Sequence, residues 1–470
     1  MNRSIFKEYD IRGIIDIDWN VEDAYDIGRG IFSYFLYNNP SLNRIVIGMD
    51  GRVHSEEIKK KLIQAAHHAK LDVIDIGLTA TPVLYSTLYT TKTTSGLMIT
   101  ASHNPGNYNG IKICLNRRSI WGKELKKIAT IIQEKRFYRP ILNSIATVKT
   151  YDANSAYINY LKKSFTHLIG SEIPVIFDCA NGAAGSIMPD LVKAMEWKNA
   201  TLLFEEVDGT FPNHEADPTV KKNMTVLIDA IKSKPKTHVG IGFDGDADRM
   251  GFINEQGDLI AGDQLLALFA QQINWEDKNK QVICDIKCSQ GLAESLKKSN
   301  INVMMVPSGH SIIKSEMEKT GTILGGELSC HFFFADRYFG YDDGIYAALR
   351  MIEILQNRGI PASELFTFFP QKISTAEIRI SCGDHDKVRI IAAVKEQFYT
   401  HKDAEIIDVD GVRVQTSYGW GLMRASNTES HFCFRFESDT LKGLKKIQNN
   451  FIEILHPLIN TAALKEKLEQ

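Results

Sequence analysis

Three aspartates at alternate positions, Asp244, Asp246 and Asp248, are followed by Arg249 and are the residues of this chain best suited to chemistry. Three like charges this close together repel, so we expect the fold to supply a cation that offsets the repulsion. Their ligand atoms are all hard oxygens, which favours Mg²⁺ or Ca²⁺ over zinc or copper. Gly245 stands between the first two aspartates and gives the backbone the freedom to curl, so that the carboxylates converge.

Two other interpretations compete with a catalytic metal site. The spacing of the acids resembles the opening of an EF-hand, and Glu255 falls at the twelfth position of such a loop. The sixth position, however, is Arg249 instead of glycine, and the flanking residues 239–243 and 250–253 are typical of strands and not of helices. The second alternative is a solvated acidic turn. A catalytic site is favoured because Arg249, beside the metal, could hold a phosphate.

A serine in a polar loop gives the metal something to act on. Ser102 and His103 follow the apolar run 96–99 and precede Asn104 and Pro105. A free hydroxyl is a weak nucleophile and needs a base or a metal to activate it. It is also a natural carrier for a phosphoryl group, and a phosphoserine would add an anionic oxygen to the metal ligands. The alternative is an ordinary loop serine.

Short apolar runs alternate with amphipathic stretches along most of the chain. Residues 44–49 read as a strand, 55–70 as a helix and 71–76 as a strand. This rhythm indicates a parallel or mixed sheet covered by helices, and it restarts near residues 174 and 282. We therefore predict an α/β protein with three similar α/β domains, which have mixed sheets, and a smaller C-terminal α+β domain around a central cleft.

The predicted domains comprise residues 1–150, 151–255, 256–370 and 371–470. The last domain is set apart by strand-like runs near 375–380, 412–414 and 431–436 that are grouped with helices. Its first helix is predicted over residues 386–400. We expect Val388, Ile391, Val394 and Phe398 on its inward side.

The bulk composition describes an ordinary globular protein of 470 residues with a formal net charge of −2. No long block of one charge sign favours a nucleic-acid or membrane surface, and no window is apolar enough to span a membrane. The beginning of the sequence lacks the apolar segment of a signal peptide. The 7 cysteines are scattered and odd in number, so we expect a reduced cytoplasmic protein. We expect a monomer or weak homo-oligomer that binds neither nucleic acid nor membrane.

Four motifs in this order carry a resemblance to a known family. They are residues 100–105 around Ser102, the aspartate loop 244–249, residues 326–331 with Glu327, and residues 424–429, which begin with Arg424. Residues 7–13 fit as well. Together they resemble the α-D-phosphohexomutase superfamily, and within it the bacterial enzymes that act on mannose and glucose phosphates. Three departures stand out: Ala247 and Cys330 replace glycines that are common in the family, and Ser430 stands where proline is frequent.

The resemblance implies roles for individual residues. Ser102 matches the serine that carries the phosphoryl group, and with Asp244, Asp246 and Asp248 it completes the protein ligands of Mg²⁺. Further catalytic roles are implied for Arg12, His103, Lys112, Arg249 and His310. Substrate binding is implied for Tyr9, Lys287, Glu327, Ser329, His331, Arg424, Ser426, Asn427 and Thr428. Lys112 alternates with apolar neighbours, so it should point away from the core, toward either the cleft or open solvent.

The activity implied by the resemblance is a mutase that moves phosphate between C1 and C6 of a hexose. Its small-molecule partners would be sugar phosphates, and its cofactors would be Mg²⁺ and a hexose 1,6-bisphosphate that serves as activator and intermediate. Alternatives are a mutase for glucosamine phosphate, a metal-dependent sugar phosphatase and a non-catalytic sugar-phosphate sensor. The intact serine and all three aspartates argue against the sensor.

Overall fold

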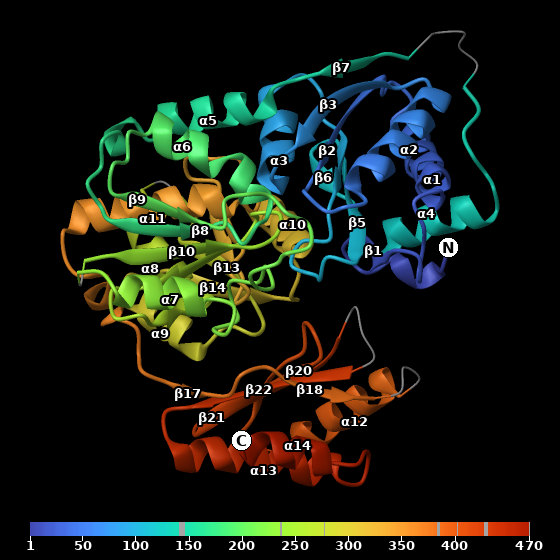
Figure 1. The fold of residues 1–470 in the computed structure, drawn as a ribbon. Coiled ribbons are helices and arrows are strands. Elements are labelled where there is room, and N and C mark those ends of the chain that lie inside the picture. Colours follow the sequence, from blue (N-terminus) through green and yellow to red (C-terminus); the bar gives the residue numbers. More distant parts are fainter. Residues whose placement is uncertain are drawn as a thin grey trace.

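The computed structural model describes residues 1–140, 146–235, 237–276, 278–382, 386–401, 403–426 and 431–469. Four β-sheets follow one another along these residues, each with helices from its own stretch of chain (Figure 1). The first three sheets mix parallel and antiparallel pairs, whereas the strand pairs described in the fourth are antiparallel. The predicted fold class, three α/β units and a C-terminal α+β unit, is confirmed.

The first sheet has the strand order β1-β5-β4-β2-β3-β7, and β6 pairs with β5. Alternation along its strands divides the core, because successive side chains point to opposite faces. Ile45 and Ile47 pack with α1, α2 and α4, while Val46 packs with α3 on the other face. The elements are η1 (Arg3–Ile5), β1 (Ile11–Ile14), α1 (Asp23–Asn38), β2 (Arg44–Met49), α2 (Ser55–His68), β3 (Asp72–Leu78), α3 (Thr81–Thr90), β4 (Gly96–Ile99), β5 (Tyr108–Leu115), β6 (Arg118–Ser119), α4 (Lys123–Gln133) and β7 (Val148–Thr150).

The second sheet has the order β12-β11-β10-β8-β9. Its central strand β10 pairs in parallel with β8 and antiparallel with β11. Helix α7 covers one face, packing on Ile176 and Ile253. The elements are α5 (Ala153–Ser164), η2 (Thr166–Leu168), β8 (Val175–Asp178), η3 (Ala183–Ser186), α6 (Met188–Ala194), β9 (Ala200–Leu203), α7 (Thr225–Lys232), β10 (Val239–Phe243), β11 (Met250–Ile253) and β12 (Leu259–Ile260).

The third sheet has the order β14-β13-β15-β16. Strand β13 is parallel to both of its neighbours, and β16 closes the sheet antiparallel to β15. The elements are α8 (Gly262–Gln272), β13 (Gln281–Asp285), α9 (Gln290–Lys297), β14 (Asn302–Val306), α10 (His310–Thr320), β15 (Leu324–Gly326), β16 (Phe332–Phe334), α11 (Gly344–Arg358) and η4 (Ala362–Phe366). One continuous apolar core joins this unit to the second and to α3 of the first.

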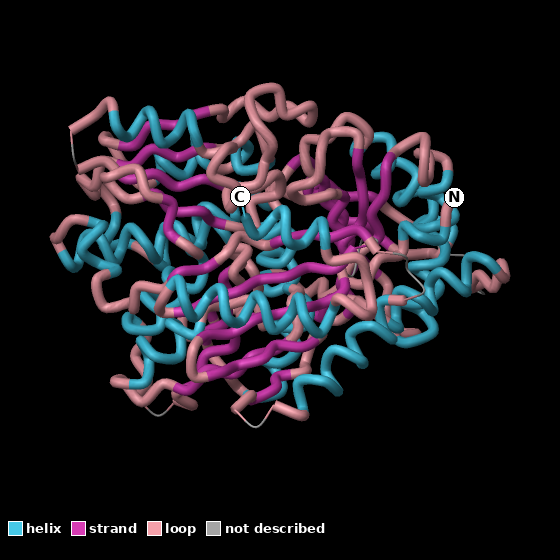
Figure 2. The backbone as a smooth tube through the Cα atoms, turned by 90° about the horizontal axis from the view of Figure 1, so that it is seen from below, coloured by secondary structure: helices cyan, strands magenta, loops and turns pink. Residues whose placement is uncertain are grey.

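The fourth sheet has the order β17-β22-β21-β20-β19, and β18 also pairs with β22. Its helices lie on the face turned away from the other units (Figures 1 and 2). The elements are β17 (Ile373–Ser374), β18 (Ile378–Ser381), α12 (Lys387–Tyr399), β19 (Glu405–Ile407), β20 (Val412–Thr416), β21 (Gly419–Ala425), β22 (His431–Ser438), α13 (Leu441–Leu455) and α14 (Ala462–Glu469). The unit has its own core and meets the third unit through a cluster of Ile286, Trp420 and Leu422.

One expectation about α12 is wrong. Val388 is 83% exposed, and Ile390 is buried at 1% instead. Val394 and Phe398 are buried as predicted, and Ile391 packs against the core only partly. The apolar spacing predicted Val388 on the inward side of the helix. Val388 lies in the first turn of α12, however, and its side chain faces away from the core. In the part of the chain that the structure describes, every helix is too short or too polar to cross a lipid bilayer.

Candidate active site

The serine loop and the aspartate loop, from different sheets, meet at the ends of their strands. Ser102 lies three residues after β4, and Asp244 follows β10 directly. The Ser102 hydroxyl donates a hydrogen bond to Oδ2 of Asp244 over 2.9 Å. Ser102 is 2% exposed and adopts a left-handed backbone conformation with φ of 50°. The hydroxyl and the acids, 142 residues apart in sequence, thus share one buried site.

The glycine of the aspartate loop serves another purpose than the predicted one. A Cβ on Gly245 would lie 2.4 Å from the carbonyl oxygen of Ser102, closer than real contacts allow. The left-handed residue of the loop is Ala247, with φ of 60°, and not Gly245. Gly245 therefore lets the two loops touch, while the curl of the chain is made by Ala247 at a small conformational cost.

Asp244, Asp246 and Asp248 form one buried acidic cluster. Each has an exposed fraction of 0%, and their nearest ligand oxygens lie within 4.8 Å of one another. Strands β10 and β11 flank the loop, so an EF-hand is excluded, and full burial excludes a solvated turn. Burial and the charges of Asp248 and Asp246 raise the pKa of Asp244 well above its usual value.

The donor set fits a hard divalent cation. Oδ1 of Asp246 is buried and has no hydrogen-bond partner among the described residues, which is costly unless something else binds it. Oδ2 of the same carboxylate is held by the Thr81 hydroxyl at 2.6 Å. Carboxylate oxygens, with the Ser102 oxygen beside Asp244, are the ligands that Mg²⁺ and Ca²⁺ prefer. The site is thus suited to a metal that binds oxygen.

Lys112 points into the acidic cluster and not toward solvent. Its ammonium donates to Oδ2 of Asp246 at 2.7 Å and also to Asp248. The side chain is 5% exposed. Burial lowers the pKa of Lys112, but Asp246 and Asp248 outweigh that effect and raise it above its usual value. A fixed positive charge therefore lies within the acidic cluster, where an anionic phosphoryl group would be attracted.

His331 connects the aspartate loop to the third sheet. Its Nε2 lies 3.1 Å from Asp248, and its Nδ1 lies 3.0 Å from Glu327. Burial lowers its pKa, but Asp248 and the hydrogen bonds to both acids raise the pKa of His331 to about 9. His331 in turn lowers the pKa of Glu327 to about 2 against the effect of burial. Arg249 Nε lies 3.3 Å from Nε2 of the same imidazole. When both ring nitrogens are protonated, the imidazole donates its two N–H groups to the acids and has no acceptor to offer Arg249.

Two further histidines lie beside the cluster in different protonation environments. His103 Nδ1 is 3.2 Å from the Ser102 hydroxyl. Burial and the charges of Arg249 and Arg12 lower the pKa of His103 well below its usual value, which favours the neutral form of its ring. His310 Nδ1 is 3.1 Å from Asp342, and burial together with Lys314 lowers its pKa.

The residues expected to bind the sugar and the distal phosphate lie in the third and fourth units. Oε1 of Glu327 accepts from the amide of Gly309 at 2.7 Å, and the hydroxyl of Ser329 lies 3.4 Å from His331 Nδ1. Arg424, at the end of β21, is 7% exposed and donates to Asp410 over 2.7 Å. Asp410 also accepts from the amide of Ser308 at 3.4 Å.

Other predicted residues surround these contacts. The hydroxyl of Tyr9 donates to the carbonyl of Ser308. Arg12 donates to Asn104, in the serine loop, at 2.6 Å. Lys287 lies 3.5 Å from Asp285. The amide of Ser426 donates to the carbonyl of His431 at 2.9 Å. Asn427 and Thr428 lie outside the described residues.

Several residues that hold these groups were not found from the sequence. Thr81 binds Asp246, Asp342 holds His310 and Lys314, and Asp410 holds Arg424. Asp285, at the end of β13, accepts hydrogen bonds from the Ser308 hydroxyl and the amide of Leu328. The Asp-Gly turn at 410–411 and the position of Asp285 at a strand end were available signals. Nothing local marks Thr81 or Asp342.

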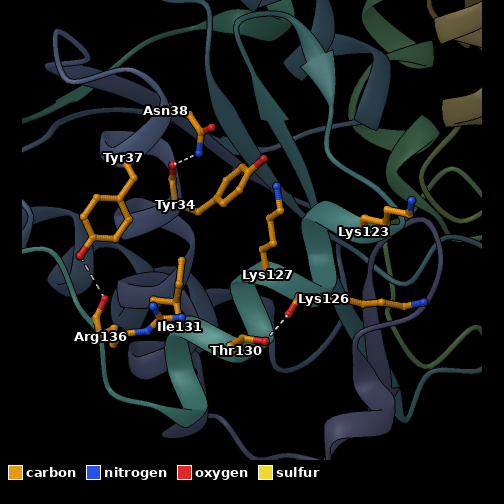
Figure 3. A pocket seen from close by; sticks show the side chains of 9 residues that line it. All are labelled: Tyr34, Tyr37, Asn38, Lys123, Lys126, Lys127, Thr130, Ile131 and Arg136. Carbon is orange, nitrogen blue, oxygen red and sulfur yellow. Dashed lines mark hydrogen bonds between the residues drawn. The ribbon is translucent and has the colours of Figure 1, made fainter.

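A hollow of about 590 Å³ lies elsewhere, between α1 and α4 of the first unit (Figure 3). Tyr34, Tyr37 and Ile131 line it, and exposed lysines stand around it. Figure 3 shows Lys127 extending toward Tyr34, while Lys126 points away. None of the predicted site residues lines this hollow.

Comparison with known proteins decides the family. Models of phosphoglucomutase/phosphomannomutase match in all four parts: alpha/beta/alpha domain I at residues 3–139, domain II at 155–257, domain III at 261–373 and the C-terminal domain at 377–454. The chain belongs to the phosphoglucomutase/phosphomannomutase family. The predicted resemblance is confirmed, and this family member is a phosphohexomutase, an isomerase that transfers a phosphoryl group.

Relatives of this phosphoglucomutase/phosphomannomutase family member span nearly its whole length. A phosphomannomutase/phosphoglucomutase of Pseudomonas syringae is 39% identical, over 95% of this chain and 94% of the relative. A phosphoglucomutase of Neisseria meningitidis is 37% identical, over 96% and 97%. A crystal structure of a family protein from Burkholderia thailandensis superposes with a TM-score of 0.88 at 31% identity, covering 99% of this chain and 98% of the other.

Proposed function

We propose that this phosphohexomutase interconverts the 1-phosphate and the 6-phosphate of mannose and of glucose through a phosphoserine at Ser102 and a hexose 1,6-bisphosphate. The observation that carries the proposal is the 2.9 Å hydrogen bond from the Ser102 hydroxyl to Asp244 within a buried acidic cluster. A relative named for both sugars, 39% identical, supports the choice of substrates.

The proposed reaction consists of two transfers that balance. The free hydroxyl of the bound monophosphate loses its proton as it attacks the phosphorus of phosphoserine 102. The bond from phosphorus to the serine oxygen breaks, and the serine oxygen takes up a proton. The bisphosphate then turns end for end. The Ser102 hydroxyl loses its proton to a base and attacks the other phosphate. The bond from that phosphorus to the sugar oxygen breaks, and the sugar oxygen takes up a proton to become the free hydroxyl of the product. His103, whose Nδ1 lies 3.2 Å from the Ser102 hydroxyl, is proposed as the base that takes the proton.

The metal ion is proposed to be Mg²⁺, held by Asp244, Asp246, Asp248 and a phosphoserine oxygen. When bound, it would stabilise negative charge on the transferring phosphoryl group. The chain's own cations do the remaining electrostatic work: Lys112 beside the cluster and Arg249 beside Asp244.

Substrate orientation is proposed to depend on contacts between units. Glu327, Ser329 and His331 would bind sugar hydroxyls, since an acid, a hydroxyl and an imidazole provide both donors and acceptors. Arg424, with Ser426, Asn427 and Thr428, would hold the phosphate that is not transferred. Tyr9, Arg12, Lys287 and His310 would line the path between the two sites.

The remaining assignments follow from the same proposal. Sugar phosphates are the proposed small-molecule partners, and we propose a monomer or weak homo-oligomer that uses no nucleic acid or membrane. A cytoplasmic location is supported by the cysteines, since six of them are buried free thiols: Cys114, Cys179, Cys284, Cys288, Cys330 and Cys433.

The proposal is tested with purified protein on mannose 1-phosphate, glucose 1-phosphate and glucosamine 1-phosphate. We expect conversion of the first two, phosphate on Ser102 of the wild type, and a fall of at least about 1,000-fold in turnover for Ser102→Ala without loss of folding. Near-normal turnover by Ser102→Ala would refute the phosphoserine. Release of inorganic phosphate that matches substrate loss would identify a phosphatase instead.

A further inference from the structure

Arg52, which no motif above includes, lies behind the serine loop. It follows β2 by three residues, and its side chain has an exposed fraction of 0%. Its Nε donates to Oδ2 of Asp50 at 3.1 Å, and Asp50 is fixed in turn by the Ser55 hydroxyl at 2.9 Å. A buried guanidinium is costly, so its remaining donors need partners.

All of those partners are backbone carbonyls, three in the serine loop and one at the start of β5. The NH2 group donates to the carbonyls of Ser102 at 2.7 Å and Asn104 at 2.6 Å. The NH1 group donates to those of Pro105 at 2.6 Å and Tyr108 at 3.0 Å. With the bond to Asp50, the five N–H donors of the guanidinium are all used. A lysine, with three donors on one atom, could not reproduce this planar set.

This arrangement fixes the shape of the loop and the position of the hydroxyl. Ser102 adopts φ of 50°, a conformation that is strained for a non-glycine residue and persists only when its surroundings impose it. Carbonyls drawn toward Arg52 turn the amide of His103 away from it, because a trans peptide holds its C=O and N–H on opposite sides. Those bonds hold the serine where its hydroxyl meets Asp244.

The second unit closes over the same arginine. The ring of Phe211 lies with its centroid 5.1 Å from the guanidinium carbon. A Cβ on Gly209 would lie 2.4 Å from the Cα of Arg52, so only glycine allows the segment that carries Phe211 to lie this close. Arg52 is therefore sealed between the serine loop and the unit that provides the aspartates.

We propose that Arg52 is a positioning residue that holds the serine loop in the conformation required for phosphoryl transfer. The inference rests on the proposed function, because transfer to Ser102 is its readout. Arg52 does not touch the reacting atoms in this proposal. It acts through the four carbonyls, and its effect should fall on the transfer step more than on the affinity for sugar phosphate.

The test compares Arg52→Lys with wild type and with Arg350→Lys. Arg350 is 2% exposed and is bound to Asp336 in the third unit. Its replacement also disturbs a buried guanidinium, but one whose ion pair lies outside the serine loop. Glucose 1,6-bisphosphate is the probe, and the rate of phosphate incorporation at Ser102 is measured by mass spectrometry. We expect Arg52→Lys to lower that rate and kcat about 100-fold with KM within about 3-fold, and Arg350→Lys to leave both unchanged.

Asp50→Asn is the second variant and keeps the arginine. It should slow incorporation about 10-fold while the protein melts cooperatively, which keeps the test decisive if Arg52→Lys fails to fold. Incorporation by both folded Arg52 and Asp50 variants within about 3-fold of wild type would overturn the inference. No incorporation in the wild type itself would refute the proposed function instead, and the two failures are thereby distinguished.

Discussion

Two regions of the molecule gather cations, and they differ in what faces each charge. In the candidate active site, Lys112 lies against two aspartates and Arg424 against Asp410, with side chains 5% and 9% exposed. Around the hollow of the first unit, Lys126 and Lys127 are exposed on the polar face of α4. The hollow of the first unit is therefore not the region that the buried, paired charges support as the active site.

Burial explains the difference. A charge removed from water must be paired, and in such surroundings each interaction is stronger than at the surface. The buried cations hold fixed positions next to groups that can react, whereas exposed lysines are hydrated and their interactions are screened by salt. The comparison teaches that paired, buried charges mark the chemistry of this protein, and it can be tested region by region.

Removal of the divalent cation should have the largest effect. A chelator is expected to lower mutase turnover at least about 1,000-fold, because the acidic cluster would lose the charge that stabilises the transferring phosphoryl group. Steady-state assays before and after addition of Mg²⁺ measure this. Full activity in the chelated protein would contradict the role given to the acidic site.

Lys112→Met should destabilise the protein by about 3 kcal/mol, since it leaves two buried carboxylates without their cation. Thermal unfolding in the absence of metal measures the loss. Added Mg²⁺ should restore part of it, because the ion supplies positive charge to the same oxygens. An unchanged melting temperature without metal would show that Lys112 does not stabilise the cluster.

Arg424→Gln is expected to raise KM for hexose phosphate about 10-fold to 100-fold with little change in kcat, since a charge-assisted contact to phosphate would be lost in all bound states. Initial rates over a range of substrate concentrations measure both constants. Arg118→Gln is the matched control: Arg118 is also paired with an acid, Glu124, but is 46% exposed. A fall in kcat alone for Arg424→Gln would contradict a binding role.

A buried pair outside the acidic site sharpens the comparison. His214 Nε2 lies 3.1 Å from the buried Asp178. Burial lowers the pKa of His214, but the bond to Asp178 outweighs it and raises the pKa above the usual 6.5. Its stabilisation should be complete below pH 6.5 and be lost as pH rises through the raised pKa. His214→Asn should cost about 1 kcal/mol at pH 6 and less at high pH, by thermal unfolding, with kcat unaffected.

The smallest effect is expected in the hollow. Lys126→Ser combined with Lys127→Ser should change stability by less than about 0.5 kcal/mol and kcat/KM by less than about 2-fold, as exposed substitutions usually do. Thermal unfolding and the coupled assay check both values. A change of more than 10-fold in kcat/KM would overturn the comparison.

Much of the fold was predictable because local patterns carry it. Apolar runs such as 44–49 and 239–243 form strands. Candidate site residues follow such strands, as Asp244 follows β10. The inward side of α12 was predicted wrongly at Val388, where tertiary packing overrides a spacing that fits more than one face. The domain boundaries remain predictions.

The candidate site was predictable in its motifs but not in its pairings. Because Lys112 alternates with apolar neighbours along its strand, the sequence allowed it to face either the cleft or solvent. Only the approach of the second unit directs its side chain to Asp246. Ala247 and Cys330 stand where glycine is common in the family, and both adopt positive φ, of 60° and 66°. Replacing glycine by these two residues thus preserves a left-handed backbone conformation in both loops, at some conformational cost.

The sequence by itself determined which residues are suited to chemistry, because side-chain type and spacing fix what a serine or three alternate acids can do. The tertiary structure decided which charges are buried together, which carbonyls converge on Arg52 and which lysines stay exposed. The physical reason is that a buried charge must be paired by groups distant in sequence, and local periodicity contains no information about them.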